Sequence, residues 1–117
     1  MHRYRDLKFW TESKNFSVDI YRITILFPSE EKFGIVDQMR RAAVSVASNI
    51  AEGSSRNSNN EFKRFLSFSM GSAYELETQL EISRDLEFIS NEEYERLTSQ
   101  LTSIIKQMAK FRSNCLQ

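Results

Sequence analysis

Apolar residues recur every three or four positions along four stretches of the chain, which is the spacing of one side of an α-helix. The most regular series is the last one, which runs through Tyr94, Leu97, Leu101, Ile104, Met108 and Phe111. The first stretch contains Phe9, Ser13, Phe16, Ile20, Ile23 and Phe27. These patterns predict helices over residues 6–27, 30–53, 59–88 and 91–113.

Residues that start or stop helices lie between these stretches. Pro28 is expected to end the first helix, because the residue before a proline avoids helical geometry. Ser29 is expected to cap the second helix, with two acidic residues in its first turn, and Gly53 is expected to stop it. Capping-box patterns precede the third and fourth helices, at Ser58 with Glu61 and at Ser90 with Glu93.

Four helices joined by short turns predict an all-α fold, an antiparallel up-down-up-down four-helix bundle in which residues 1–117 form a single domain. We expect the second and third helices to fold back about Arg56, so that Ala43 lies opposite Ser69. Ala42 then meets Met70 and Gly71, and small residues face small residues in a close mid-bundle contact. A bulky residue at Gly71 is therefore expected to destabilise the fold by overpacking.

The apolar residues exceed what the core of one bundle requires. The first helix has a second apolar face, made of Leu7, Trp10, Val18, Tyr21 and Ile25. The third helix adds four apolar residues outside its main series, namely Phe65, Phe68, Ile82 and Leu86. Large exposed apolar patches mark interfaces between proteins, so we expect this chain to form an oligomer.

The 16 basic residues balance the 16 acidic ones, so the formal net charge is zero and no overall attraction to nucleic acid or membranes is expected. The charges are unevenly placed along the chain. Residues 75–95 contain eight acidic residues and one basic residue, whereas residues 103–117 contain three basic residues and no acidic one. No apolar stretch has the length of a signal peptide or membrane span, and the single cysteine, Cys115, suits a reducing compartment. A cytoplasmic location is expected.

The sequence contains few groups that perform catalysis. The one histidine, His2, lies in a terminus that is expected to fray, so a histidine-based acid–base pair is not expected. The sequence also lacks a Gly-rich phosphate loop and the Glu-x-x-His pairs that hold metals in bundles. We expect no catalytic residue, no metal and no cofactor. An enzyme would require Arg41, Asn49 and Glu52 to converge in a cleft.

Five basic residues on or beside the central hairpin are candidate nucleic-acid contacts: Arg40, Arg41, Arg56, Lys63 and Arg64. The last three are near the hairpin turn, where they would form a patch that a ring would repeat by symmetry. The alternative for all five is a role as surface charges and in salt bridges between subunits. Asn49 and Glu52 are expected to be structural, Asn49 by bonding across helices and Glu52 by pairing with an arginine.

A further set of residues at fixed spacing corresponds to a known family: Gln38, Arg40–Ala43, Ser45, Asn49–Gly53, Gly71–Ser72, Glu75–Leu76 and Gln79–Leu80. On these residues the chain resembles the bacterial four-helix-bundle proteins encoded in 23S rRNA intervening sequences. The resemblance implies assembly into a homopentameric ring, and we assign structural or assembly roles to Asn49, Glu52, Gly53, Gly71 and Ser72. It also implies a similarity to accessory proteins of diversity-generating retroelements, which partner a reverse transcriptase and bind nucleic acid.

The expected function is that of a non-enzymatic oligomeric scaffold or adaptor, whose leading partner is RNA or an RNA-processing protein. One alternative is a purely protein-binding module with no nucleic-acid role, which would dock its partner on exposed apolar residues. The least favoured alternative is an enzyme with its site at a subunit junction.

Overall fold

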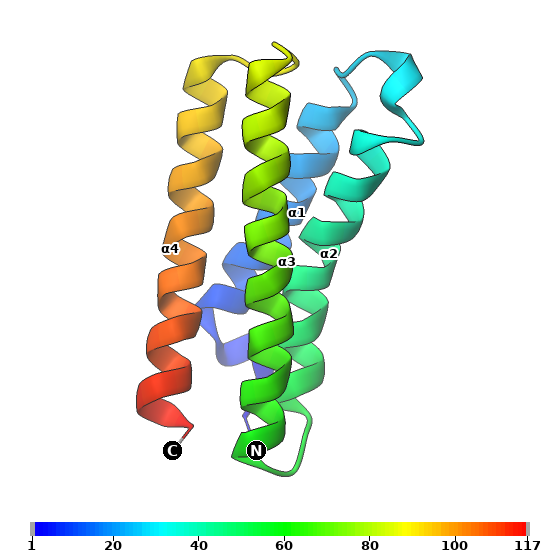
Figure 1. The fold of residues 1–117 in the computed structure, drawn as a ribbon. Coiled ribbons are helices and arrows are strands. Elements are labelled where there is room, and N and C mark those ends of the chain that lie inside the picture. The colour runs from blue at the N-terminus through cyan, green and yellow to red at the C-terminus, as the bar shows by residue number, and fades with distance from the viewer. Residues whose placement is uncertain (1, 117) are drawn as a thin grey trace.

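The computed structural model describes residues 2–116, which form four α-helices and two short 3-10 helices (Figure 1). The α-helices are α1 (Lys8–Thr24), α2 (Ile35–Ser54), α3 (Asn59–Asp85) and α4 (Asn91–Cys115), and the 3-10 helices are η1 (Tyr4–Asp6) and η2 (Ser29–Glu31). Consecutive α-helices run in opposite directions, and α4 closes the bundle against α1. The predicted all-α, antiparallel up-down-up-down bundle is confirmed.

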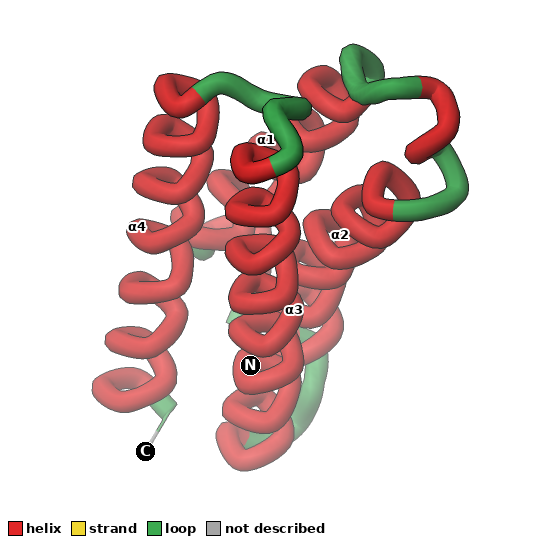
Figure 2. The backbone as a smooth tube through the Cα atoms, turned by 45° about the horizontal axis from the view of Figure 1, so that its top comes forward, coloured by secondary structure: helices red, strands yellow, loops and turns green. Residues whose placement is uncertain are grey.

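The predicted apolar series form the core of the bundle. In α1 the buried residues are Phe9, Ser13, Phe16, Ile20 and Thr24, and in α4 they are Leu97, Leu101, Ile104, Ile105 and Met108. The apolar side of each helix thus faces the other three helices, as its period requires. Figure 2 shows that the connections between the helices lie at the two ends of the bundle. Both chain termini lie at the end that holds the α2–α3 turn (Figure 1).

Two of the three predicted N-caps, Ser58 and Ser90, are present. The Ser58 hydroxyl accepts a hydrogen bond from the backbone N–H of Glu61, and the Ser90 hydroxyl accepts one from Glu93, each at 3.1 Å. These bonds satisfy backbone donors that the first turn of a helix leaves without a partner. Each glutamate directs its carboxylate to an arginine three residues later.

The predicted start of the second helix is wrong. Ser29 begins η2 and does not cap α2, which starts at Ile35 without a side-chain cap. The cause is Gly34, whose φ of −107° and ψ of −116° lie outside the helical region and separate η2 from α2. The resulting corner leaves the side chain of Phe33 89% exposed.

The third and fourth helices begin at Asn59 and Asn91 as predicted, whereas several other helix ends differ. The first helix is shorter at both ends, and α4 continues two residues past the expected end. The third helix ends at Asp85 because Glu87 adopts a left-handed φ of 63°. The N–H of Glu87 bonds to the carbonyl of Arg84 at 2.9 Å, and the N–H of Phe88 bonds to that of Ser83 at 2.8 Å. This pair of bonds is a Schellman motif, which closes a helix end.

Gly53 does not act as the predicted helix stop. It is buried within α2, and no glycine of the described residues has a positive φ. A Cβ atom at this position would lie 2.7 Å from the Cβ of Phe65 and 2.9 Å from Cδ1 of Phe62. The glycine is therefore needed for a close approach of α2 and α3 next to their turn.

The predicted contact at Gly71 is wrong within one subunit. A Cβ atom there would meet nothing within 4 Å. Ser69 lies opposite Val46 and not Ala43, since its hydroxyl donates to the Val46 carbonyl at 2.7 Å. The pairing differs by three residues because α2 continues to Ser54 and the chain turns beyond Arg56, the assumed centre.

Replacing Gly71 with alanine is expected to raise the free energy of unfolding by about 1 kcal/mol. Alanine restricts the unfolded chain more than glycine does, and at this open position it meets no neighbour. Urea denaturation of the variant and the wild type at one protein concentration measures the difference. A loss of stability would show that another chain approaches Gly71.

Candidate assembly and nucleic-acid surfaces

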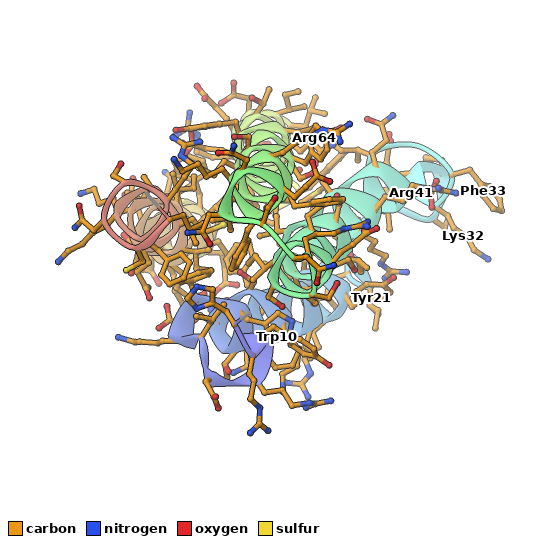
Figure 3. All side chains as sticks on the ribbon, turned by 90° about the horizontal axis from the view of Figure 1, so that it is seen from below. Trp10, Tyr21, Lys32, Phe33, Arg41 and Arg64 are labelled. Atoms are coloured by element: carbon orange, nitrogen blue, oxygen red, sulfur yellow. The ribbon has the colours of Figure 1, made fainter. Side chains whose placement is uncertain are left out.

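The first two predicted nucleic-acid contacts, Arg40 and Arg41, lie in the first half of α2. Arg40 ties α2 to α1, because its Nε donates to Thr24 Oγ1 at 2.9 Å and its guanidinium lies 4.6 Å from the centre of the Tyr21 ring. Arg41 is 80% exposed, and its Nε lies 3.0 Å from a carboxylate oxygen of Asp37, one helical turn earlier. Arg40 is thus engaged within the fold, whereas Arg41 points outward (Figure 3).

The other three predicted contacts lie around the α2–α3 turn. Arg56 pairs with Glu52 at 3.1 Å, and its guanidinium lies over the ring of Phe65. Arg64 pairs with Glu61 at 3.6 Å. Lys63 forms no ion pair with any of residues 2–116. The structure therefore divides the five candidates between the two halves of the bundle, and nucleic-acid binding by them stays a prediction.

Polar residues of α2 and α3 form a short hydrogen-bond chain. The Asn49 amide donates to the carbonyl and to the hydroxyl of Ser45, both at 2.9 Å. The Ser45 hydroxyl in turn lies 2.9 Å from that of Ser72. Asn49 thus bonds to its own helix, and the link to α3 that we expected of it is made by Ser45. Glu52 pairs with Arg56, which lies in the turn that follows α2.

The three residues that an enzyme would require do not converge. Within the described residues Arg41 and Asn49 each bind a partner on α2, and Glu52 binds Arg56 in the turn after α2, each four positions away. The only histidine does not fray as expected, since the ring of His2 packs against those of Phe62 and Phe111 at 5.6 and 5.2 Å. Residues 2–116 contain no group of three or more potential metal ligands.

Two grooves border the exposed helix faces. The groove between α1 and α4 has a volume of about 440 Å³ and is lined in part by Glu12 and Asp19. Both carboxylates are engaged, Glu12 by Gln107 at 2.9 Å and Asp19 by Arg96 at 4.0 Å. A shallower groove of about 290 Å³ between α2 and α3 is lined by Gln38, Arg41, Ala42, Ser45, Ser72 and Glu75. It brings together residues on which the family resemblance depends.

One titratable pair lies at the start of α4. The Arg96 guanidinium donates to the Glu93 carboxylate at 3.0 Å, and this bond lowers the pKa of Glu93 and raises the pKa of Arg96. Both side chains are more than 40% exposed, so the pair contributes little to stability. Its role is local, at the first turn of the helix.

Ten large apolar side chains of the described residues are at least 42% exposed. Six lie on α1, on α2 or in their connection and form what we name the shoulder surface: Val18, Tyr21, Ile25, Leu26, Phe33 and Val44. Four belong to the α3 surface: Phe68, Tyr74, Ile82 and Leu86. Figure 3 shows Tyr21 and Phe33 projecting from the side of the bundle away from α4. Trp10, expected on the same face as Tyr21, is instead half-buried beside the Tyr4 ring.

The charged residues are separated along the bundle axis, which the sequence analysis did not anticipate. We define the basic half as residues 2–15, 45–72 and 104–116, which contains both termini and the α2–α3 turn. It carries ten Lys or Arg and four Asp or Glu, a net charge of +6. The acidic half, residues 16–44 and 73–103, carries six Lys or Arg and twelve Asp or Glu, a net charge of −6. The two halves cancel in the net charge of the chain, which is zero.

The comparisons with known proteins agree with the fold. The sequence matches the 23S rRNA-intervening sequence protein family over residues 5–110. A solved structure from the S23 ribosomal protein family of Bacteroides thetaiotaomicron VPI-5482, a protein of unknown function, is 26% identical with a TM-score of 0.83. The match covers 91% of this chain and 96% of that one. Curated proteins give no match. No helix within residues 2–116 could span a membrane. The chain belongs to the 23S rRNA-intervening sequence protein family.

Proposed function

We propose that this protein is a non-enzymatic subunit of a cytoplasmic homopentameric ring that serves as a scaffold for RNA. The observation that carries the proposal is the exposed apolar surface. The core of the single subunit already contains 23 buried apolar residues, so the ten exposed ones are not needed to complete it. Apolar patches of this extent on a soluble bundle are typical of protein interfaces.

The placement of the two apolar surfaces favours a ring. The shoulder surface is formed by α1, α2 and their connection, whereas the α3 surface belongs to another helix, so each subunit can offer two different contacts. Contact between unlike surfaces of successive subunits is heterologous, and it gives a ring when the rotation closes. Most of both surfaces lies in the acidic half, so neighbouring subunits can meet with their axes parallel. The number five follows from the family resemblance.

The same two surfaces differ in charge. Residues 16–44, which carry the shoulder surface, contain four basic and four acidic residues and are neutral, whereas residues 73–85 of α3 contain Glu75, Glu77, Glu81 and Asp85 against one basic residue, Arg84. Like charges would repel each other in a contact between two α3 surfaces. This repulsion favours contact between the shoulder of one subunit and the α3 surface of the next.

The mass of the protein in solution tests the assembly. Light scattering on a sizing column is expected to give five subunits of 13.8 kDa, about 69 kDa. A monomer or dimer would overturn the ring. Addition of RNA at low and moderate salt is expected to produce a salt-sensitive complex. A pentamer without RNA affinity would favour the purely protein-binding scaffold.

A further inference from the structure

The basic half carries cations on two adjacent helices, α3 and α4. Four cations of these two helices make no ion pair with any of residues 2–116, and we name them the cation cluster: Lys63, Lys106, Lys110 and Arg112. No acidic residue occurs after Glu95, so the second half of α4 presents basic charge alone. Elsewhere in this half, Arg3, Lys8, Arg56 and Arg64 are each paired with a carboxylate. Arg5 and Lys14 form no ion pair within the described residues, but they lie over the Trp10 ring, at 5.5 and 5.9 Å from its centre.

One hydrogen bond fixes how the two helices align within the cluster. Arg112 of α4 donates to the Ser67 hydroxyl of α3 at 3.1 Å. Lys63 lies one turn from Ser67, and Lys106 lies one turn from Lys110, which is two residues from Arg112. With a rise of about 1.5 Å per residue, the four cations lie within roughly 15 Å of one another along the axis. All four thus lie in the same part of the basic half, on two adjacent helices.

We propose that the cation cluster, with the rest of the basic half, binds the phosphodiester backbone of RNA. Each phosphate carries a full negative charge, and the cluster offers cations that no carboxylate of the described residues already neutralises. Of the large exposed apolar residues, only Phe68 lies in the basic half, and the guanidinium of Arg64 lies 5.4 Å from the centre of its ring. The phosphate contacts therefore dominate, and we expect binding with little dependence on base sequence.

The acidic half does not cancel this attraction. The molecule is 43 Å long, whereas the Debye length at physiological ionic strength is about 8 Å. A phosphate at the basic end is thus screened from most of the carboxylates at the other end. Because the site acts locally, the net charge of zero does not exclude RNA binding.

Assembly strengthens the interaction, and this step rests on the proposed ring. In a cyclic ring with parallel axes, every subunit points the same way, so the basic halves gather on one face. The acidic halves gather on the opposite face, which repels RNA. Repetition of the cation cluster around one face lets a single RNA strand bind several subunits at once, and its contacts then add by avidity.

The test uses fluorescence anisotropy with labelled oligouridine and the full chain. A basic-half variant carries Lys63→Gln, Lys106→Gln and Lys110→Gln. A charge-matched variant carries the same changes with Glu87→Gln, Glu92→Gln and Glu95→Gln in the acidic half, which restores the wild-type net charge of zero. Glutamine is a good helix former, so both variants are expected to keep the fold, which circular dichroism checks.

Both variants are expected to bind oligouridine at least about tenfold more weakly than wild type, with a salt slope lower by about two for three lost phosphate contacts. Wild-type affinity in the basic-half variant would overturn the site. Recovery of affinity in the charge-matched variant would also overturn it, because net charge and not the basic half would then control binding. Variants that keep the mass of the wild type show that the loss does not come from disassembly.

Two further outcomes separate this inference from the proposed ring. A wild-type pentamer that binds no oligouridine at low salt would overturn the RNA site and leave the ring. A wild-type monomer that binds oligouridine through the cation cluster would overturn the ring and support the site. The affinity for oligothymidine of the same length is measured as a comparison with oligouridine. Weaker binding to it assigns the site to RNA, and equal binding assigns it to any single-stranded phosphodiester backbone.

Discussion

Replacing Gly53 with alanine is expected to lower the free energy of unfolding by about 1–3 kcal/mol, although alanine is the better helix former. The added Cβ would lie 2.7 Å from Phe65 Cβ and 2.9 Å from Phe62 Cδ1. The Cβ of Phe65 is attached directly to the backbone of α3, so it cannot move unless the two helices separate. Urea denaturation measures the loss of stability. We expect a lower midpoint with the same dependence of the unfolding free energy on urea concentration as in the wild type.

Gly71→Ala is the matched control for this variant. Both positions are glycines inside α-helices with negative φ, so the two substitutions have the same intrinsic effect on the helix. They differ in their neighbours, since Gly71 has none within 4 Å. We expect stability to fall at Gly53 and rise at Gly71. Equal changes at both positions would contradict the close α2–α3 contact.

Two variants that each lose one apolar surface are expected to be monomers that pair only with each other. The shoulder variant carries Ile25→Ser and Phe33→Ser, and the α3 variant carries Ile82→Ser and Leu86→Ser. Each pair of substitutions removes about 3–6 kcal/mol of apolar burial from a contact. Each variant retains one intact surface, so an equal mixture is expected to give a heterodimer of about 28 kDa from two 13.8 kDa chains.

The mixture distinguishes a heterologous contact from a two-fold one. If the shoulder paired with a second shoulder, the α3 variant would still associate alone and mixing would add nothing. The substituted side chains are 44–89% exposed in the single subunit, so their loss should leave its fold intact. If either variant alone formed pentamers, the surface altered in that variant would not be a contact between subunits.

The regular parts of the fold were predictable because they depend on local periodicity. The buried series of α3, from Phe62 to Ser83, follows the predicted spacing, and the caps at Ser58 and Ser90 depend on residues only three apart. The Ser29 cap failed because Gly34 adopts a non-helical conformation that the acidic first turn does not reveal. The end of α3 depends on Glu87, a residue type with no strong preference for a positive φ.

Features that depend on how helices meet were not predictable from one sequence. Gly53 and Gly71 look alike along the chain, yet only Gly53 touches a neighbouring helix, because the α2–α3 alignment is set by the exact turn. The basic half could have been anticipated in part. The acidic run of residues 75–95 and the basic run of residues 103–117 were visible, and an antiparallel hairpin places them at opposite ends.

The separation of +6 and −6 charges gives each subunit a permanent electric dipole along its long axis. In the proposed ring these dipoles are parallel and add. At an ionic strength of 0.01 M the Debye length is about 30 Å, so the basic face of one ring attracts the acidic face of the next and rings stack in columns. At 0.15 M this attraction acts only across about 8 Å. If RNA binds the basic face as proposed, RNA and a second ring compete for that face, and RNA is expected to dissolve the columns.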